Sequence, residues 1–212
     1  MKKIVLVLTC AMMSLGAFAQ VQFGAKVGFD LTNFWGENVG HKIRPNYQVG
    51  VLMEYKATPK FAIAPEVVFA AQGGKESITV TGTSKFEATQ TYNTNYINIP
   101  IMLKYYVTPD FSIDFGPQLG INVYSKTTVK LSLRDKEVLP EGVTEKTTTD
   151  FKDATKAIDF GVGLGATYYL AENIFVQARY TMGLTKVFKE DYILDNSKYH
   201  NGNAQISFGM KF

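Results

Sequence analysis

Apolar and polar residues alternate with a period of two along most of the chain. In the clearest example, Val21 to Thr32, Val, Phe, Ala and Leu residues alternate with Gln, Gly, Lys, Asp and Thr residues. This period indicates a β-strand with one apolar and one polar face. Similar runs span residues 47–56, 61–69, 97–106, 111–123, 158–170, 174–184 and 204–212. No helical periodicity competes with them after residue 20, so the sequence predicts an all-β fold of eight strands.

Short and long connections alternate between the predicted strands. Tight turns occur at residues 57–60, 108–110 and 171–173. Long polar loops run from Trp35 to Arg44, Gln72 to Thr91, Lys126 to Thr155 and Phe188 to Gly202. Short periplasmic turns and long external loops are typical of bacterial outer-membrane barrels. The sequence therefore predicts an eight-stranded antiparallel up-and-down transmembrane β-barrel with both chain ends on its short-turn side.

The aromatic residues decide which face of this barrel points outward. A soluble, lipocalin-like barrel would share the strand count and the alternation, but its apolar face would line the interior. On the apolar face of the strands, however, aromatic residues gather at the short-turn ends, as in the interfacial girdle of a membrane barrel. We expect this periplasmic girdle to consist of Phe23, Tyr55, Phe61, Tyr105, Phe111, Tyr168 and Phe212.

Charged residues of both signs lie on the polar face of the strands, near the middle of each strand. The predicted lumen charges are Lys26, Asp30, Glu54, Glu66, Lys104, Asp114, Asp159, Arg179 and Lys211. An eight-stranded barrel is only wide enough to be filled by its own side chains. We therefore expect these groups to pair in a structural charge network, because buried charges need partners before they can serve a proton or ion relay.

Three prolines, Pro65, Pro100 and Pro117, fall within predicted central strands, where each removes a hydrogen-bond donor from the ladder. The alternation keeps its parity across all three. We therefore expect the local loss of one hydrogen bond at each proline rather than a break in the strand.

The first residues predict export. Lys2 and Lys3 precede an apolar run from Ile4 to Leu15, and Ala17-Phe18-Ala19 then offers a cleavage site before Gln20. The predicted domains are thus a cleaved signal peptide, residues 1–19, and a barrel, residues 20–212. Cleavage removes the only cysteine, Cys10, and leaves 20 of the 22 basic residues against 19 acidic ones. This balance gives no support to nucleic-acid binding.

Catalytic, metal-binding and cofactor-binding patterns are missing from the sequence. The two histidines, His41 and His200, fall in predicted external loops. A lipid-modifying enzyme would need a serine and an acidic group beside a histidine, and only Ser197, Glu190 and Asp191 are near His200 in the sequence. Glycines spaced by two within a strand cannot form a phosphate-binding loop. The sequence predicts neither an enzyme nor a metal or cofactor site, and it names no ligand-binding residue.

The loop from Lys126 to Thr155 allows two interpretations. Thr127, Val129, Leu131 and Leu133 continue the alternation of the preceding strand, so a hairpin can project beyond the membrane and offer an edge for strand addition. Alternatively, the segment is a mobile charged loop. Its seven basic and six acidic residues between Lys126 and Lys156 favour the mobile loop.

Several stretches resemble those of a known family. The most specific is YINIPIMLKYY, from Tyr96 to Tyr106, followed by a Thr-Pro turn. Further stretches are FGAKVGFDLTNF, GPQLGINV, FGVGLGATYYL and the closing ISFGMKF. Together they resemble the PorT-like outer-membrane β-barrel proteins of Bacteroidetes, which are built like the small barrels OmpX and OmpA. Some members of that family are tied to type IX secretion, and its terminal strand is the part that barrel assembly machinery reads.

These observations predict a structural or interaction protein of the outer membrane whose long external loops determine its specificity. The expected partners are outer-membrane lipid, the barrel assembly machinery and a protein at the external loops. The alternatives are a small-solute channel, an accessory component of protein secretion and, with least support, a lipid-modifying enzyme.

Overall fold

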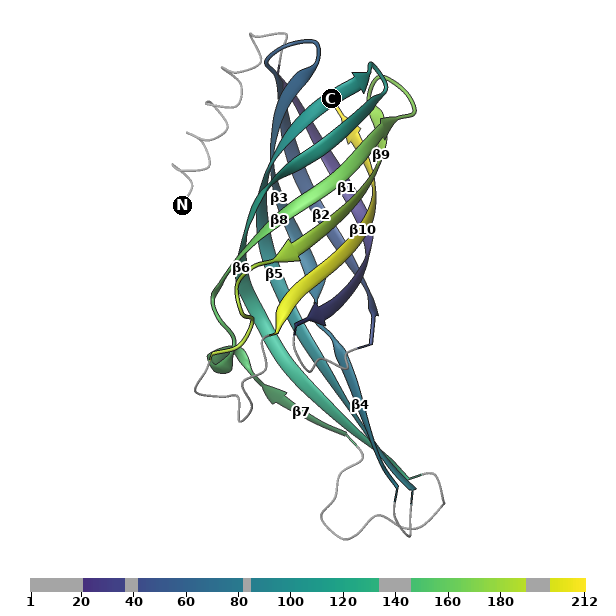
Figure 1. Ribbon diagram of the computed structural model, residues 1–212, viewed down its shortest axis with the longest axis vertical. Helices are drawn as coiled ribbons and strands as arrows, with labels where there is room; N and C mark the ends of the chain where they lie inside the picture. Colours follow the sequence, from purple (N-terminus) through teal and green to yellow (C-terminus); the bar gives the residue numbers. More distant parts are fainter. Residues whose placement is uncertain (1–20, 37–41, 82–84, 134–145, 190–198) are drawn as a thin grey trace.

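A computed structural model describes residues 21–36, 42–81, 85–133, 146–189 and 199–212 (Figure 1). The predicted signal peptide and the cleavage position at Ala19 and Gln20 lie outside the described residues. The strands are β1 (Val21–Trp35), β2 (Arg44–Lys56), β3 (Phe61–Gln72), β4 (Lys75–Thr81), β5 (Lys85–Thr108), β6 (Phe111–Leu133), β7 (Lys146–Asp150), β8 (Ile158–Tyr169), β9 (Ile174–Gly183) and β10 (His200–Lys211). A short 3-10 helix, η1 (Lys152–Ala154), follows β7.

Eight of these strands close into a ring, and the predicted barrel is confirmed. The order around it is β5-β3-β2-β1-β10-β9-β8-β6, and pairing of β5 with β6 completes the circle. Every neighbouring pair is antiparallel. Backbone hydrogen bonds between Phe23 and Phe212 tie the last residue to the start of β1, so both ends of the barrel chain lie on the short-turn side (Figure 1).

The predicted facing of the strands is also confirmed. On β1, Lys26 and Asp30 are buried inside the ring, whereas Val27 and Phe29 are 59% and 54% exposed on its outer wall. Most of the large exposed apolar side chains of the described residues lie on this outer face of the strands. The lipocalin-like arrangement, with an apolar interior and a polar exterior, is therefore wrong. No helix within the described residues is long and apolar enough to cross a membrane.

The prolines leave the strand register unchanged. Pro65 pairs with Ile101, Pro100 with Gln118 and Pro117 with Val162, and the pairing on both sides of each proline keeps the same register. The irregularities of the β5–β6 ladder lie elsewhere, between Asn95 and Tyr96 and between Tyr106 and Thr108. The prolines thus cost ladder hydrogen bonds without breaking the strands, as expected.

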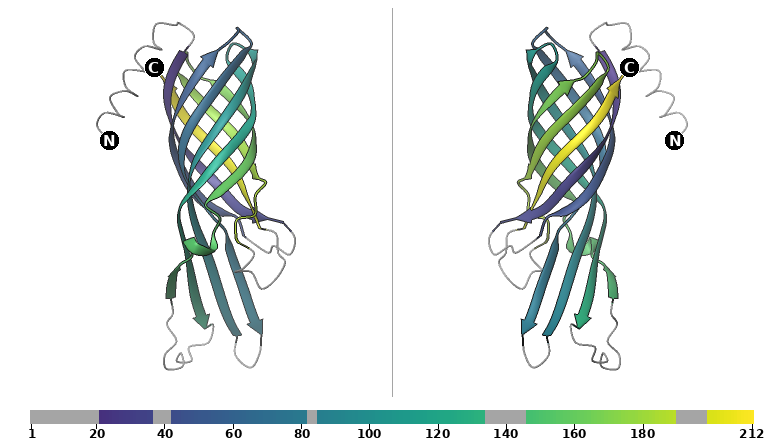
Figure 2. Two further views of the ribbon diagram at one scale, coloured as in Figure 1. Left: turned by 90° about the vertical axis from the view of Figure 1, so that its left-hand side faces the viewer. Right: turned by 90° about the vertical axis from the view of Figure 1, so that its right-hand side faces the viewer.

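The external connections differ from the prediction, because two of the expected loops form a sheet. Residues 72–91 make β4 and the first part of β5, while β6 continues to Leu133 and pairs with β7. These four strands project from the barrel as the sheet β4-β5-β6-β7 (Figure 2). A mobile loop is therefore wrong for residues 126–133 and 146–150, and residues 134–145 lie outside the described part.

A glycine lies where the chain passes from the barrel strand β3 into the projecting strand β4, both of which pair with β5 in one register. Gly73 has a φ of +129°, a conformation that side chains rarely adopt, and a Cβ there would lie 2.1 Å from the carbonyl oxygen of Tyr92. β3 ends just before it and β4 starts two residues after it. The predicted loop Gln72–Thr91 was therefore wrong, because strand structure continues beyond Gln72 in the same direction.

A second glycine allows two strands to approach closely, and it gives a test of the packing. A Cβ at Gly116 would lie 2.0 Å from the backbone oxygen of Ile101, so alanine there forces β5 and β6 apart. We expect Gly116→Ala to destabilise the barrel by about 1–3 kcal/mol, measured by denaturant unfolding in phospholipid vesicles. Its cross-strand partner Gly163 provides the control, because a Cβ there meets nothing closer than 3.5 Å. Equal stability of Gly116→Ala and Gly163→Ala would contradict this close approach.

Candidate functional site inside the barrel and on its external sheet

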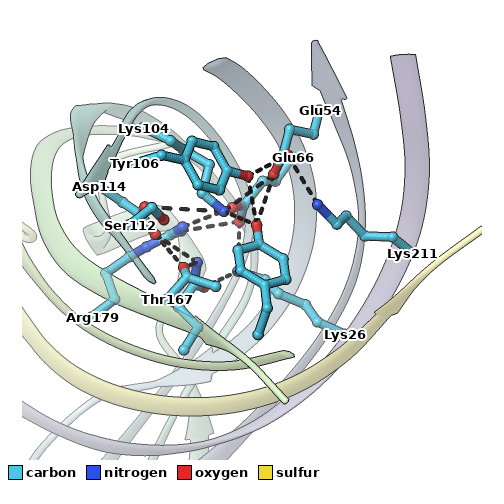
Figure 3. A network of polar contacts seen from close by, with 12 residues as sticks. Lys26, Glu54, Glu66, Lys104, Tyr106, Ser112, Asp114, Thr167, Arg179 and Lys211 are labelled. Carbon is cyan, nitrogen blue, oxygen red and sulfur yellow. Dashed lines mark hydrogen bonds and ion pairs between the residues drawn. The ribbon is translucent and has the colours of Figure 1, made fainter. Parts of the chain in front are cut away.

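The carboxylate of Glu54 is the centre of one layer of polar contacts in the lumen (Figure 3). It accepts hydrogen bonds from Lys211 at 2.9 Å, Lys104 at 3.3 Å, Tyr106 at 2.5 Å and Tyr169 at 3.0 Å. The Nζ of Lys211 also lies 4.2 Å from the ring centroid of Tyr169. These residues come from four different strands, so a single carboxylate joins distant parts of the ring.

Glu66 is the centre of the next layer. Arg179 donates two hydrogen bonds to its carboxylate, at 3.0 and 2.7 Å, in the two-pronged geometry that guanidinium groups favour. Lys26 donates a third at 2.5 Å and also reaches Gln177 at 3.1 Å. Glu66, Lys26 and Arg179 are all nearly inaccessible to solvent. One carboxylate therefore compensates two buried cations.

Asp114 links the two layers (Figure 3). Its carboxylate accepts hydrogen bonds from Ser112 at 2.7 Å, Thr167 at 2.5 Å and Gln177 at 3.1 Å, and it lies 4.0 Å from the Nζ of Lys104. The resulting network includes side chains from all eight strands of the ring.

Seven of the nine predicted lumen charges belong to this network. Asp30 and Asp159 do not. Asp30 is fully buried and accepts a weak 3.4 Å hydrogen bond from the amide of Asn203. Asp159 is only half-buried and accepts a 2.7 Å hydrogen bond from Asn201 near the external end. Within the network the charges are four cations against three carboxylates, and Asp30 brings the buried acids to four.

An apolar cluster closes the short-turn end of the lumen below Glu54. It consists of Leu52, Ala62, Tyr106, Tyr169 and Phe175, all buried. The ring of Phe175 lies directly over Gly209, where a Cβ would come within 2.2 Å of it. Sequence reasoning missed this plug, although Phe175 shares its parity with Gln177 and Arg179 and was therefore bound to point inward.

A second apolar cluster covers the external mouth. Buried Phe34, Val187 and Phe188 form its centre, and Tyr92, Phe151 and Tyr199 pack against them. Ring centroids in this cluster lie 5.4–6.3 Å apart, mostly in edge-to-face pairs. Burial raises the pKa of Tyr92 to about 12, so its phenol stays protonated at neutral pH. The ionic layers lie between these two apolar clusters. Packed side chains therefore block the lumen formed by the described residues at several levels.

The outer wall carries aromatic residues at both ends. At the short-turn end, the predicted girdle residues Tyr55, Phe61, Tyr105, Tyr168 and Phe212 are exposed, and Phe23 and Phe111 are partly exposed. A second belt toward the opposite end was missed by sequence reasoning. It consists of Phe29, Tyr47, Phe69, Phe160 and Tyr180. Trp35 and Tyr124 lie further out, because Trp35 is six residues beyond Phe29 on β1 and Tyr124 is five residues beyond the partner of Phe160 on β6.

The spacing of the two belts fits the apolar thickness of a membrane. On β2, β3 and β8 the two belts contribute one residue each at the same spacing, and these pairs are Tyr47 and Tyr55, Phe61 and Phe69, and Phe160 and Tyr168. Each pair is separated by eight residues, which corresponds to about 26 Å along a strand and roughly 20 Å along the axis of a tilted barrel. The apolar band of outer-membrane barrels is about 25 Å tall.

Of the residues considered for catalysis, His200 alone lies in the described part of the chain. The ring of His200 stacks on Trp35 with centroids 4.7 Å apart, and Trp35 donates a 3.0 Å hydrogen bond to the carbonyl of Asn201. His41, Ser197, Glu190 and Asp191 lie outside the described residues. Among residues that are described, no group of three or more His, Cys, Asp or Glu side chains could hold a metal ion.

The projecting sheet has two outer strands, and they differ in how open they are. β4 pairs with β5, and Lys42 pairs with its first residue, Lys75. β7 pairs with β6 along Lys146–Asp150, and all five of its residues are exposed. Within the described residues nothing pairs with the other edge of β7. Its backbone groups on that edge are thus free to pair with an added strand.

Comparison with known proteins identifies a matching family model and several solved structures. The family model described as outer membrane protein beta-barrel domain matches residues 18–189. Among solved structures, Ail of Yersinia pestis is 11% identical, with a TM-score of 0.49 over 91% of this chain and 99% of that one. Neisserial surface protein A is 11% identical, with a TM-score of 0.40 over 91% and 97%. OprG from Pseudomonas aeruginosa is 17% identical, with a TM-score of 0.33 over 91% and 96%. No curated protein matches the chain.

Proposed function

The chain belongs to the outer-membrane β-barrel family, and from this we propose that it is an interaction protein that presents the sheet β4-β5-β6-β7 outside the cell. It is located in the outer membrane, where the lipid bilayer surrounds its apolar wall. The two aromatic belts support a placement in which the short turns face the periplasm and the sheet faces outward.

The unusual length of β5 and β6 is the main support for the proposal. β5 and β6 are 24 and 23 residues long, whereas the other ring strands have 10–15 residues. A span of the membrane needs only about 9–11 residues. The additional length makes no contribution to crossing the bilayer, and it builds a surface with an open strand edge. Such an edge suits a partner that binds in an extended conformation by adding a strand.

The interior favours this function over a solute channel. A channel needs a continuous aqueous path, and the lumen of the described residues holds a paired ionic network between two apolar clusters. We expect no steady single-channel conductance from purified protein in planar bilayers. Steady conductance that disappears on substitution of Lys104 or Arg179 would instead favour the channel.

A cross-linking experiment in intact cells tests the interaction. With a photoreactive amino acid at Thr147, in the exposed edge strand β7, we expect capture of a defined protein partner. The same group at Lys60, in an exposed turn on the opposite side of the membrane, is the matched control. Capture at Lys60 but not at Thr147 would contradict the proposal.

We also propose a narrower family for this chain and a role in protein secretion. The stretch Tyr96 to Tyr106 and the closing residues to Phe212 support a place among the PorT-like proteins of Bacteroidetes, and a terminal strand that the barrel assembly machinery recognises. If the chain assists secretion, a deletion strain will retain secreted cargo. Normal cargo release with an unchanged lipid profile would leave the surface interaction as its role and dispose of both the secretion role and the lipid-modifying enzyme.

A further inference from the structure

One face of the projecting sheet continues the lipid-facing wall of the barrel. Tyr124, on β6 just outside the external aromatic belt, is 40% exposed, and the Nζ of Lys126 lies 5.1 Å from the centroid of its ring. Residues two apart on a strand share a face. Thr128 and Lys130 therefore carry the same face further from the membrane. We refer to the part of this face between Tyr124 and Lys130, with its neighbours on β4, β5 and β7, as the outward face.

Lysines from three strands meet on the outward face. Lys130 of β6 pairs directly with Lys146 of β7, and Lys126 pairs with Asp150. Lys75 of β4 pairs with Thr91 of β5, which pairs in turn with Thr128. The described charged residues of this region are thus Lys75, Lys126, Lys130 and Lys146 of the sheet, Lys42 beside Lys75, and Asp150. The carboxylate of Asp150 is already engaged by the backbone N–H of Lys152 at 2.9 Å.

This charge arrangement is unfavourable unless an anion is present. Like charges directly opposite each other destabilise a sheet, yet Lys130 faces Lys146, and Lys42 faces Lys75 beside them. Lys75, Lys130 and Lys146 are exposed, and they form no ion pair with another described residue. Hydroxyl donors lie between them, for instance Thr128 and Thr148, whose Oγ1 atoms are 3.3 Å apart. Clustered ammonium and hydroxyl donors of this kind suit the oxygen atoms of phosphate groups.

We propose that the outward face binds the phosphorylated sugar head groups of glycolipids in the outer leaflet of the same membrane. The face begins just outside the external aromatic belt, where Lys126 lies over Tyr124, and Lys75, Lys130 and Lys146 continue it outward, on the side where sugar and phosphate groups of the outer leaflet extend from the lipid. Basic residues next to a membrane attract anionic lipids in this way. The proposal concerns the face of the sheet and does not depend on the strand partner proposed for the edge of β7.

The test measures how much phosphorylated lipid A the protein retains. Full-length barrel is reconstituted in nanodiscs of phosphatidylcholine with phosphorylated lipid A, and bound lipid A is determined by native mass spectrometry. We expect the combined Lys75→Gln, Lys130→Gln and Lys146→Gln substitutions to weaken binding by roughly 100-fold, at about five-fold per lysine. The control combines Lys152→Gln, Lys156→Gln and Lys189→Gln, which remove the same charge from external segments outside this face.

Two further arms separate the source of the phosphate and the role of charge. Dephosphorylated lipid A should bind no better to the unchanged protein than to the variant, and high salt should abolish the difference between them. Equal retention by the two triple variants would overturn the proposal, as would tighter binding of a soluble phosphorylated polysaccharide than of lipid A. A partner captured at Thr147 alongside such a negative result would show that the edge functions and the outward face does not.

Discussion

Replacing Glu66 with glutamine is expected to destabilise the folded barrel by about 3–5 kcal/mol, the cost of leaving buried charge without its partner. Glu66 accepts two hydrogen bonds from Arg179 and one from Lys26, and all three residues are nearly inaccessible to solvent. Glutamine keeps the shape of the side chain but leaves two cations facing each other. Equilibrium unfolding in denaturant, on protein folded into phospholipid vesicles, measures the loss.

Two companion variants show whether the effect comes from charge. Lys26→Gln should cost less than half as much as Glu66→Gln, because Arg179 still pairs with Glu66 through two hydrogen bonds and the local charge is then balanced. Glu172→Gln, in an exposed turn, should lie within about 0.5 kcal/mol of the unchanged protein. If Glu66→Gln were equally mild, the lumen would have to be well hydrated, and the solute channel would regain support.

The alternation in the sequence was enough to predict the barrel and the facing of its strands. A strand has a side-chain period of two, so Lys26 and Val27 must lie on opposite sides, and the same rule placed Glu54, Glu66 and Arg179 inside. The rule does not say which inward groups meet. That depends on how far neighbouring strands are staggered around the ring, and Glu54 meets Lys104 and Lys211 only after the circle has closed.

The projecting sheet could not be recognised in the same way. β7 is polar on both faces, and the alternation of β4 is confined to the five residues from Ser77 to Thr81, so the composition of both segments resembled a loop. These residues form strands because β4 pairs with β5 and β7 pairs with β6. Such pairing joins residues far apart in the sequence, so the local pattern of each segment does not reveal it. The aromatic plugs were missed for a related reason, because Phe34 and Phe175 sit on the inward parity that was expected to be polar.

Arginine at the middle of the lipid-facing wall should also be costly. Leu164 is 59% exposed and lies midway between Phe160 of the external belt and Tyr168 of the short-turn girdle. We expect Leu164→Arg to destabilise the barrel in phospholipid vesicles by about 2–4 kcal/mol, because the guanidinium would have to leave water at the bilayer midplane. The single tryptophan, Trp35, provides the fluorescence signal for the unfolding measurement.

The matched control for this substitution is Leu170→Arg. Leu170 is the same residue type with the same 59% exposure, but it lies beyond Tyr168 at the end of β8, near the membrane surface. An arginine there should cost only about 0–1 kcal/mol, because its charge reaches the interface. The difference between the two variants therefore depends on depth in the bilayer and not on exposure. If Leu164→Arg were no more harmful than Leu170→Arg, the wall between the two aromatic belts would face water, and the membrane placement derived from those belts would be wrong.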